Sequence, residues 1–326
     1  MKKSTVCFYL GDILCTSGSV DATIENRRQK GIGICSQISG MVNGLSLGHY
    51  YFNIAFLFRE VMLLNGMLTN LEVWHPVTNK QIEVLENIDL MLLRKIIKGH
   101  SKTPKDVFFL ETGLLPIKFV AIKRRLMYLH TILSKPETEL IRKVYEVQKS
   151  LPTSKDWYEI VSEDRKNLEI YLSDKEISGM KKEKFRIVVT KAVNEFALSC
   201  LNKAASKNEN SKAKKLVKQE LVREKYLRDK RFSRSECELL FALRTKMIPG
   251  IKKNFSSQYG NNLSCDLCFV QLDSQEHLLC CVKLCGKVNI PEGVEYNDIF
   301  KGVDKQLRIV KIFKQLLRTR EILKCD

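Results

Sequence analysis

Residues 265–285 read CDLCFVQLDSQEHLLCCVKLC, a stretch that holds five of the chain's eleven cysteines and one histidine. Four of these residues follow the spacing C-x2-C-x8-H-x3-C, namely Cys265, Cys268, His277 and Cys281. The first pair forms a tight turn with two thiolates, and on a helix the second pair projects from one face on consecutive turns. Thiolate and imidazole groups fill the tetrahedral shell of structural zinc sites. The spacing therefore predicts one structural Zn²⁺, with Cys280 or Cys285 as the alternative fourth ligand.

The charge of the chain indicates a polyanionic partner. The formal net charge is +18, from 55 Lys and Arg against 37 Asp and Glu. Nucleic acid is the commonest partner of so basic a surface, because phosphate contacts release counterions. A merely basic globular protein is the alternative that composition alone leaves open. The 326 residues, 44% of them apolar, allow roughly two domains with buried cores.

Cysteine usage and hydropathy predict an intracellular protein, nuclear or cytoplasmic. The cysteine count is odd, and those outside the cluster have no disulfide-framework spacing. The N-terminus imitates a signal peptide, but Gly11-Asp12 interrupts its apolar stretch. The apolar segment 51–68 carries Arg59-Glu60 at its centre, which favours a buried helix over a membrane span. We therefore expect no membrane partner.

Apolar periodicity predicts a mainly α-helical chain after a short hairpin within the first nineteen residues. Helical periodicity begins at Asp21, and Val77-Thr78-Asn79 and Thr103-Pro104 are expected to open two further helices. Pro116 is expected to start a helix that runs to Leu133. The other helices are expected at 47–68, 137–150, 156–168, 173–203, 235–247 and 304–323, the fourth of these opened by a capping box at Ser173.

The segment 206–231 is rich in Lys and Arg and poor in large apolar residues. One interpretation is a solvated linker with a surface helix, and the other is an arm that contacts phosphates. The residues that we expect to bind nucleic acid lie in this arm and around the helix before the cysteine cluster: Lys212, Lys214, Lys215, Lys218, Arg244, Lys246, Lys252 and Lys253.

Several motifs resemble the reverse transcriptases of non-LTR, LINE-type retrotransposons. Phe8-Tyr9-Leu10-Gly11 after a short strand resembles their primer-grip hairpin. The resemblance continues through Glu111-Thr112-Gly113, Arg124-Arg125-Leu126-Met127-Tyr128, Leu239-Leu240-Phe241 with Leu243-Arg244-Thr245, and Gln275-Glu276-His277-Leu278-Leu279. It covers nearly the whole chain and corresponds to the part of such a polyprotein downstream of the catalytic palm.

The resemblance implies a helical, thumb-like bundle with an N-terminal β-hairpin, a helical connector and a small zinc knuckle. The expected parts are a primer-grip-like hairpin at 1–20, a thumb-like domain at 21–133, a connector with a basic arm at 134–232, a zinc-knuckle module at 233–290 and a basic helix at 291–326. Polymerases of this family hold Mg²⁺ with palm aspartates that include an adjacent pair, and this sequence contains no Asp-Asp pair.

We therefore expect a non-catalytic, nucleic-acid-binding fragment of a reverse transcriptase, with RNA or DNA held through its backbone. Two alternatives remain open. One is an inert relic of a decayed mobile element, and the other is an interaction module that docks on an intact reverse transcriptase. The thumb helices and the hairpin would brace the primer–template duplex, and the zinc module would present basic residues to phosphates.

Overall fold

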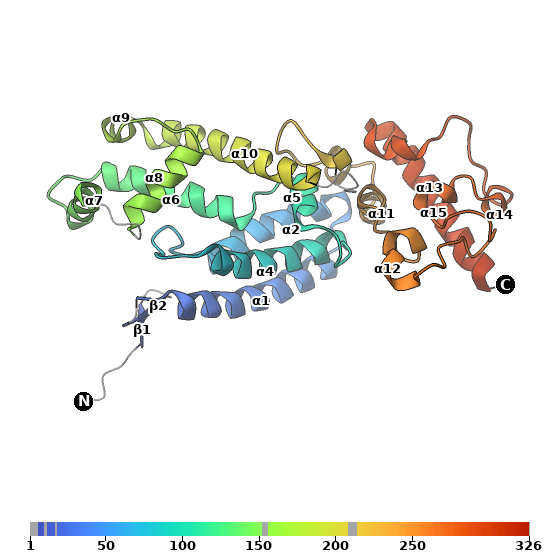
Figure 1. Cartoon of the computed structure of the whole chain (residues 1–326), viewed down its shortest axis with the longest axis horizontal. Helices are drawn as coiled ribbons and strands as arrows, with labels where there is room; N and C mark the ends of the chain where they lie inside the picture. The colour runs from blue at the N-terminus through green and yellow to red at the C-terminus, as the bar shows by residue number, and fades with distance from the viewer. Residues whose placement is uncertain (1–5, 10–11, 17, 152–155, 208–213, 326) are drawn as a thin grey trace.

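Helices form most of this chain, as the apolar periodicity predicts. The structure is a computed structural model that describes residues 6–9, 12–16, 18–151, 156–207 and 214–325. The molecule is elongated: the hairpin and α1 to α5 lie beside a second helical layer, α6 to α10, and α11 to α15 form the far end (Figure 1). No helix among the described residues has the length and hydropathy needed to cross a membrane.

The predicted N-terminal hairpin is present. Strand β1 (Val6–Tyr9) pairs antiparallel with β2 (Asp12–Cys15). The side chain of Asp12 fastens the hairpin to the helices, because its two oxygens accept hydrogen bonds of 2.8 Å from Arg27 and from Asn70. Of the four residues that resemble a primer grip, Phe8 and Tyr9 belong to β1, whereas Leu10 and Gly11 lie outside the described residues.

The helix starts predicted from capping residues are confirmed. Helix α1 (Asp21–Gly44) packs on α4 (Asn79–Ile97), which begins with a full capping box between Thr78 and Gln81. Pro104 and Pro116 are the N-caps of α5 (Lys105–Thr112) and α6 (Ile117–Leu133).

The predicted helix at 47–68 is a helical run of mixed type. It comprises η1 (Gly48–Tyr50), α2 (Tyr51–Phe58), the π-helical segment η2 (Arg59–Leu64) and α3 (Asn65–Met67). The π turn contains Arg59, whose fully buried guanidinium donates two hydrogen bonds of 2.6 Å to the buried Asp89. The charge at the centre of this apolar segment is therefore neutralised inside the protein.

The second helical layer contains α7 (Leu140–Ser150), α8 (Trp157–Asn167), α9 (Asp174–Gly179) and α10 (Lys182–Ser206). The single helix predicted at 173–203 is wrong, although its capping box at Ser173 is present. Met180 is extended, and its carbonyl oxygen lies 2.8 Å from Nε2 of His130. The imidazole is thus hydrogen-bonded to a carbonyl oxygen that, in a continuous helix, would accept a backbone hydrogen bond from within the helix. The chain bends at this residue.

Among the described residues, two groups of buried side chains form the core. One joins α1 to α5 with the end of α10, α11 and the C-terminal elements. The other lies between α6, α7, α8, α9 and the first part of α10, and includes Leu126 and Val189, both with no exposed surface. Helices α6 and α10 contribute to both cores, so the boundary expected at residue 134 lies inside the second core.

Residues 234–325 form the end of the molecule that contains the cysteine cluster. The elements are α11 (Arg234–Thr245), η5 (Lys252–Phe255), α12 (Ser256–Tyr259), α13 (Gln275–Leu278), α14 (Val282–Cys285), η6 (Tyr296–Phe300) and α15 (Val303–Cys325). We call residues 246–290 the cysteine module. Helix α15 packs against α11 and α14, so the expected C-terminal basic helix is part of the same unit.

The basic segment before α11 runs along the surface of other helices, and we call its described part, residues 214–231, the strap. Its described residues form only two short 3₁₀ turns, η3 (Lys214–Leu216) and η4 (Lys225–Leu227), and contain no surface α-helix. Leu216, Tyr226 and Leu227 are buried, and the Glu224 N–H donates to the carbonyl oxygen of Glu111 at 3.0 Å. Apolar side chains spaced through the segment thus fix much of it to α5.

Candidate metal centre and its basic surroundings

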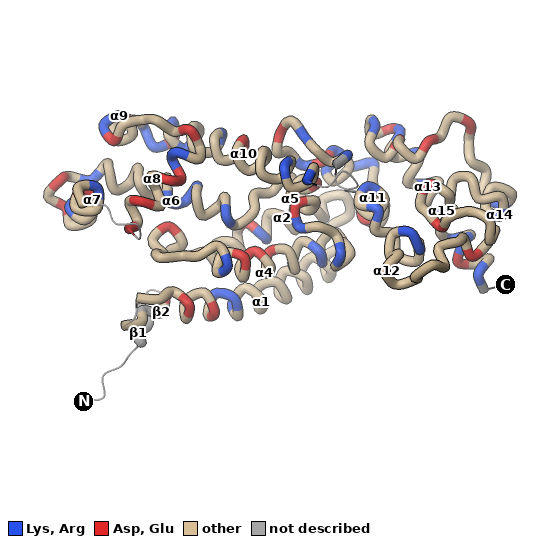
Figure 2. Tube along the Cα trace, in the orientation of Figure 1, with Lys and Arg blue, Asp and Glu red and all other residues tan. Residues whose placement is uncertain are grey.

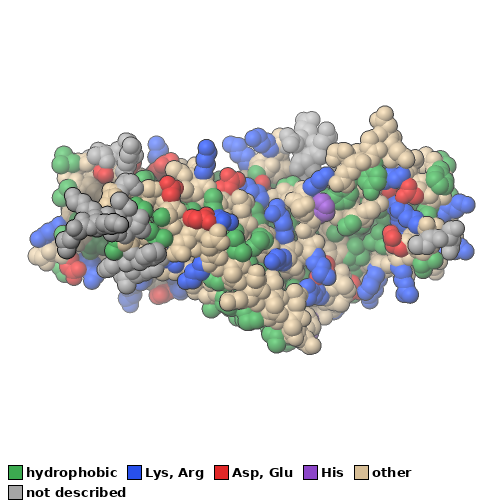
Figure 3. Space-filling view, turned by 90° about the horizontal axis from the view of Figure 1, so that it is seen from below, with side chains coloured by type: hydrophobic (Ala, Val, Ile, Leu, Met, Phe, Trp, Pro, Cys, Tyr) green, Lys and Arg blue, Asp and Glu red, His purple; other side chains and the backbone are tan. Residues whose placement is uncertain are grey.

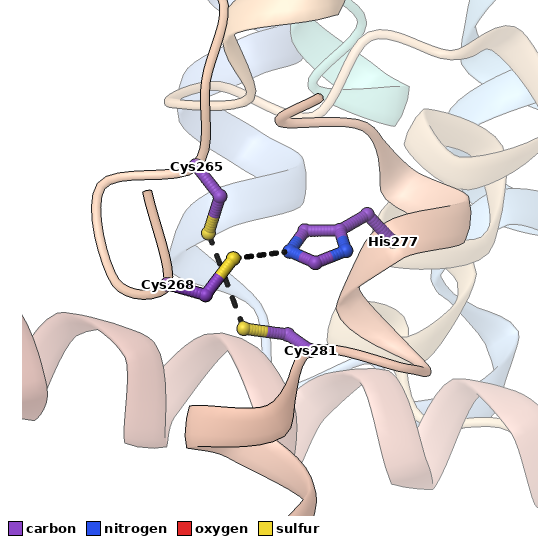
Figure 4. A group of neighbouring side chains, drawn as sticks. All are labelled: Cys265, Cys268, His277 and Cys281. Carbon is purple, nitrogen blue, oxygen red and sulfur yellow. Dashed lines mark hydrogen bonds between the residues drawn. The ribbon is translucent and has the colours of Figure 1, made fainter. Parts of the chain in front are cut away.

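Four side chains of the cysteine module converge on one point, as their spacing predicts. The Sγ atoms of Cys265, Cys268 and Cys281 and a ring nitrogen of His277 all lie within 4.8 Å of one another, and their side chains point inward (Figure 4). The Sγ atoms of Cys265 and Cys281 are 4.0 Å apart, and Sγ of Cys268 is 3.4 Å from Nε2 of His277. These are the four residues that we expect to bind the metal.

The distances suit a tetrahedral ion. Zn–S bonds of ~2.3 Å and Zn–N bonds of ~2.0 Å place two sulfurs about 3.8 Å apart, and a sulfur and a nitrogen about 3.5 Å apart. The 4.0 Å between Cys265 and Cys281 is near the first value and far from a disulfide bond of about 2.0 Å. The group can hold one metal ion with no protein ligand missing.

The first pair of ligands sits on a turn that the backbone closes. The N–H of Cys265 donates to the carbonyl oxygen of Gln271 at 2.8 Å, and Ser264 and Leu272 form an antiparallel bridge. Backbone N–H groups of Gln271 and Val270 lower the pKa of the Cys268 thiol. Such N–H groups stabilise the thiolate, which is the form that binds a metal.

The second pair does not share a helix, which corrects the geometric expectation. His277 lies on α13, whereas Cys281 is the N-cap of α14 and has an extended backbone with ψ of 115°. Ser274 starts α13 by accepting a hydrogen bond from the His277 N–H at 3.1 Å. The chain turns between the two ligands, and the turn brings Cys281 back to the thiolates.

Cys280 and Cys285, the two alternative ligands, are not among the converging residues, and Sγ of Cys280 lies on the other side of the imidazole, 3.9 Å from Nδ1 of His277. Both are exposed, and the Cys285 thiol donates to the carbonyl oxygen of Leu279 at 3.4 Å. Cys281 has no exposed surface and is one of the four converging residues. Among the described residues, the geometry thus favours Cys281 as the fourth ligand.

Gln271 is a member of the site that the spacing did not predict. Its Oε1 lies 2.7 Å from Nδ1 of His277. An Nδ1–H donated to this oxygen leaves Nε2 bare and aimed at the thiolates. Gln271 lies six residues before the histidine, and only the folded knuckle shows that the two meet.

Two of the predicted phosphate-binding residues are buried in ion pairs. Arg244, 5% exposed, pairs with Glu111 at 3.0 Å and donates to the carbonyl oxygen of Ile299 at 2.9 Å. Lys252, 7% exposed, pairs with Asp266 at 2.6 Å. Both side chains are buried and both charges are balanced by carboxylates, so this structure does not present them to a phosphate, contrary to the expectation.

The other predicted basic residues differ in their exposure and in whether they already form an ion pair. Lys218 pairs with Glu224 at 2.7 Å, and Lys246 pairs with Glu276 at 2.7 Å. Lys215 is exposed, with Nζ donating to Asn297 at 2.8 Å, and Lys253 is exposed without an ion pair to any described residue. Lys212 lies outside the described residues, and Lys214 belongs to η3.

Basic residues are distributed over the whole molecule. Lys and Arg positions follow the chain from α1 to α15 (Figure 2), and their side chains are spread over the face in Figure 3, including the end formed by the cysteine module. Next to the metal centre, Lys283 on α14 and Lys287 just after it are exposed and form no ion pair with a described residue. These two lysines were not among the phosphate-binding residues expected from the sequence.

Comparisons with protein-family models, with curated proteins and with solved structures found no match to this chain.

Proposed function

We propose that this chain binds RNA or DNA through phosphate contacts, as the thumb, connector and zinc-knuckle part of a LINE-type reverse transcriptase. The observation that carries the proposal is the four-ligand centre in a module whose surface presents lysines without an ion pair to the described residues, on a chain of net charge +18. A module fixed by a metal holds these cations in place, and a polyanion gains most from cations that are already positioned.

The proposed ion is Zn²⁺. Three thiolates and one imidazole form a soft ligand set, and a Cys₃His shell is among the common structural zinc shells. The ion would fix the knuckle turn, α13 and α14 relative to one another. Four protein ligands leave no coordination position for water, so the ion would have a structural role.

The proposed phosphate contacts are Lys253, Lys283 and Lys287. All three are exposed on the cysteine module, and each lacks an ion pair with the described residues. The Lys253 N–H donates to the carbonyl oxygen of Asp273 at 3.0 Å, which ties its backbone to the knuckle. This set replaces Arg244 and Lys252, whose charges are already neutralised inside the protein.

The proposed role is binding without catalysis. The sequence has no adjacent aspartate pair of the kind that holds the two Mg²⁺ ions of a polymerase palm. A palm supplied by another chain would place the bound nucleic acid next to a catalytic centre.

The test is binding across a salt series. Each lysine that meets a phosphate contributes about 0.9 to the slope of log affinity against log salt for duplex DNA, and about 0.7 for single strands. We expect the triple variant Lys253→Gln, Lys283→Gln, Lys287→Gln to bind more weakly to every sequence and to have a flatter slope, because phosphate contacts do not read sequence.

A matched control removes the same charge elsewhere. Lys143, Lys166 and Lys175 are exposed, lie on α7, α8 and α9 and form no ion pair with the described residues. These helices are at the opposite end of the molecule from α14 (Figure 1). The control triple Gln variant should keep the wild-type slope. Equal losses in the two triple variants would mean that net charge alone attracts nucleic acid, and would refute the proposed surface.

A further inference from the structure

An exposed aromatic residue directly follows the second metal-binding cysteine. Phe269 is 76% exposed, although it is part of the knuckle turn and its N–H donates to the carbonyl oxygen of Cys265 at 2.9 Å. Its backbone is therefore fixed by the turn while its ring is left in solvent.

The backbone of Phe269 has a conformation that favours glycine. Its φ is 57°, in the left-handed region, where a side chain with a Cβ is strained. The turn needs this conformation to bring the chain back past the thiolates, and glycine would supply it without strain. The protein thus has a benzyl side chain at a position where the fold itself would be better served by none.

Other exposed apolar side chains lie close to the metal ligands in the sequence. Val270 is 84% exposed, Leu272 is 42% exposed and Val282 is 73% exposed. Val282 follows Cys281 as Phe269 follows Cys268, and the Sγ atoms of these two cysteines lie within 4.8 Å of each other. Phe269 and Val282 therefore each adjoin a ligand of the same centre in the sequence, on the two segments that Figure 4 shows meeting there.

Exposed cations lie on and just after α14, the helix that follows Cys281. Lys283 directly follows Val282, and Lys287 lies four residues further along the chain, just after the helix. Both are exposed and unpaired with the described residues. An exposed ring on a hydrogen-bonded turn and exposed lysines in the same metal-binding module are the two features of surfaces that bind single strands: a stacking platform and charges that follow the backbone.

We propose that Phe269 stacks on an unpaired base of single-stranded RNA or DNA while Lys283 and Lys287 contact the adjacent phosphates. This inference rests on the proposed function and adds a substrate class to it. Bases inside a duplex are stacked on each other and their faces are covered, so the ring selects unpaired nucleotides. The exposed lysines of the same module and the net charge of +18 favour a nucleic acid over a protein as the partner of this ring.

The test compares single-stranded and duplex binding of three variants of the full chain in its metal-loaded form. Phe269→Ala removes the ring, Phe269→Gly also relieves the left-handed backbone, and Phe269→Tyr keeps an aromatic face. We expect the first two to bind a labelled single strand about 5-fold to 150-fold more weakly, the range for loss of one stacked base. Duplex affinity should stay the same, and Phe269→Tyr should bind like the wild type.

Stability separates a binding role from a structural one. Phe269→Gly should unfold at an equal or higher urea concentration than the wild type, because glycine suits φ of 57°. Tyr171, 79% exposed and located before α9, gives the control. Tyr171→Ala should change neither the affinity for the single strand nor that for the duplex.

The outcomes distinguish this inference from the proposed function. Wild-type single-strand affinity in Phe269→Ala and Phe269→Gly would overturn base stacking, and the lysine contacts would stand if the triple lysine variant still lost affinity. Equal losses for single strand and duplex would also overturn it, because stacking requires an open base. A wild-type chain that binds neither nucleic acid would refute both proposals.

Discussion

Arg320 on α15 and Asp273 in the knuckle form a buried, bidentate ion pair, in which each terminal guanidinium nitrogen lies 2.7 Å from one carboxylate oxygen. Arg320 is 1% exposed and Asp273 has no exposed surface. The same carboxylate accepts a hydrogen bond of 3.0 Å from the backbone N–H of Lys252. Asp273 therefore joins three segments, and the C-terminal helix holds the metal-binding turn in place.

We expect Arg320→Ala to lower the free energy of unfolding by about 3–5 kcal/mol, because it leaves Asp273 as an uncompensated buried charge. Urea denaturation followed by circular dichroism would measure the change. Arg318→Ala provides the control on the same helix, since Arg318 is exposed, and should change stability by no more than about 0.5 kcal/mol. Equal effects of the two substitutions would mean that the pair does not hold the module.

Local signals predicted the helices well because each depends on neighbouring residues. Thr78 and Gln81 lie three residues apart, and Pro116 restricts only its own backbone and that of its neighbours, so the sequence shows both helix starts. The four ligands were predictable for a similar reason. Metal coordination requires particular residue types, and a knuckle needs a short spacing.

Long-range pairing could not be predicted in this way. Arg244 and Glu111 are 133 positions apart. In the sequence, each is a charged residue of a type that usually lies on the solvated surface. Their ion pair, completed by a hydrogen bond of 2.7 Å from the Tyr226 hydroxyl to Glu111, forms only when α5, the strap and α11 meet. The same limit applies to Met180, whose carbonyl is bonded by a histidine fifty positions away.

We expect Gly113→Ala to destabilise the protein by more than about 1 kcal/mol. Gly113 ends α5 with φ of 65°, and a Cβ there would lie 2.3 Å from the backbone nitrogen of Arg223 in the strap. A methyl group would thus strain the left-handed backbone at this position, and it would also push the strap away from α5.

Gly40→Ala is the matched control, because Gly40 is an exposed position in α1 where a Cβ would meet no atom within 4 Å beyond the helix's own backbone. It should raise stability by roughly 0.5–1 kcal/mol. Thermal unfolding of both variants would measure the difference. A neutral Gly113→Ala would show that the strap does not lie against this helix end.

The last prediction concerns the metal. We expect the purified chain to contain one Zn²⁺, and a strong chelator to remove protection from hydrogen exchange around residues 263–285 while α1 and α4 stay protected. The knuckle has a single β-bridge, between Ser264 and Leu272, and helices of only four residues, whereas α1 and α4 pack on each other in the main core. Metal binding therefore contributes much of the free energy that folds the knuckle.

Neighbouring cysteines test the assignment of the fourth ligand. Cys281→Ser should abolish stoichiometric zinc binding, because its Sγ is one of the four converging ligand atoms, and Cys285→Ser should retain the ion, because its exposed thiol points to the carbonyl of Leu279. Zinc content by atomic emission and local hydrogen exchange would be measured for both variants. The reverse pattern would assign the fourth position to Cys285, and wild-type protein without zinc would exclude a structural zinc centre altogether.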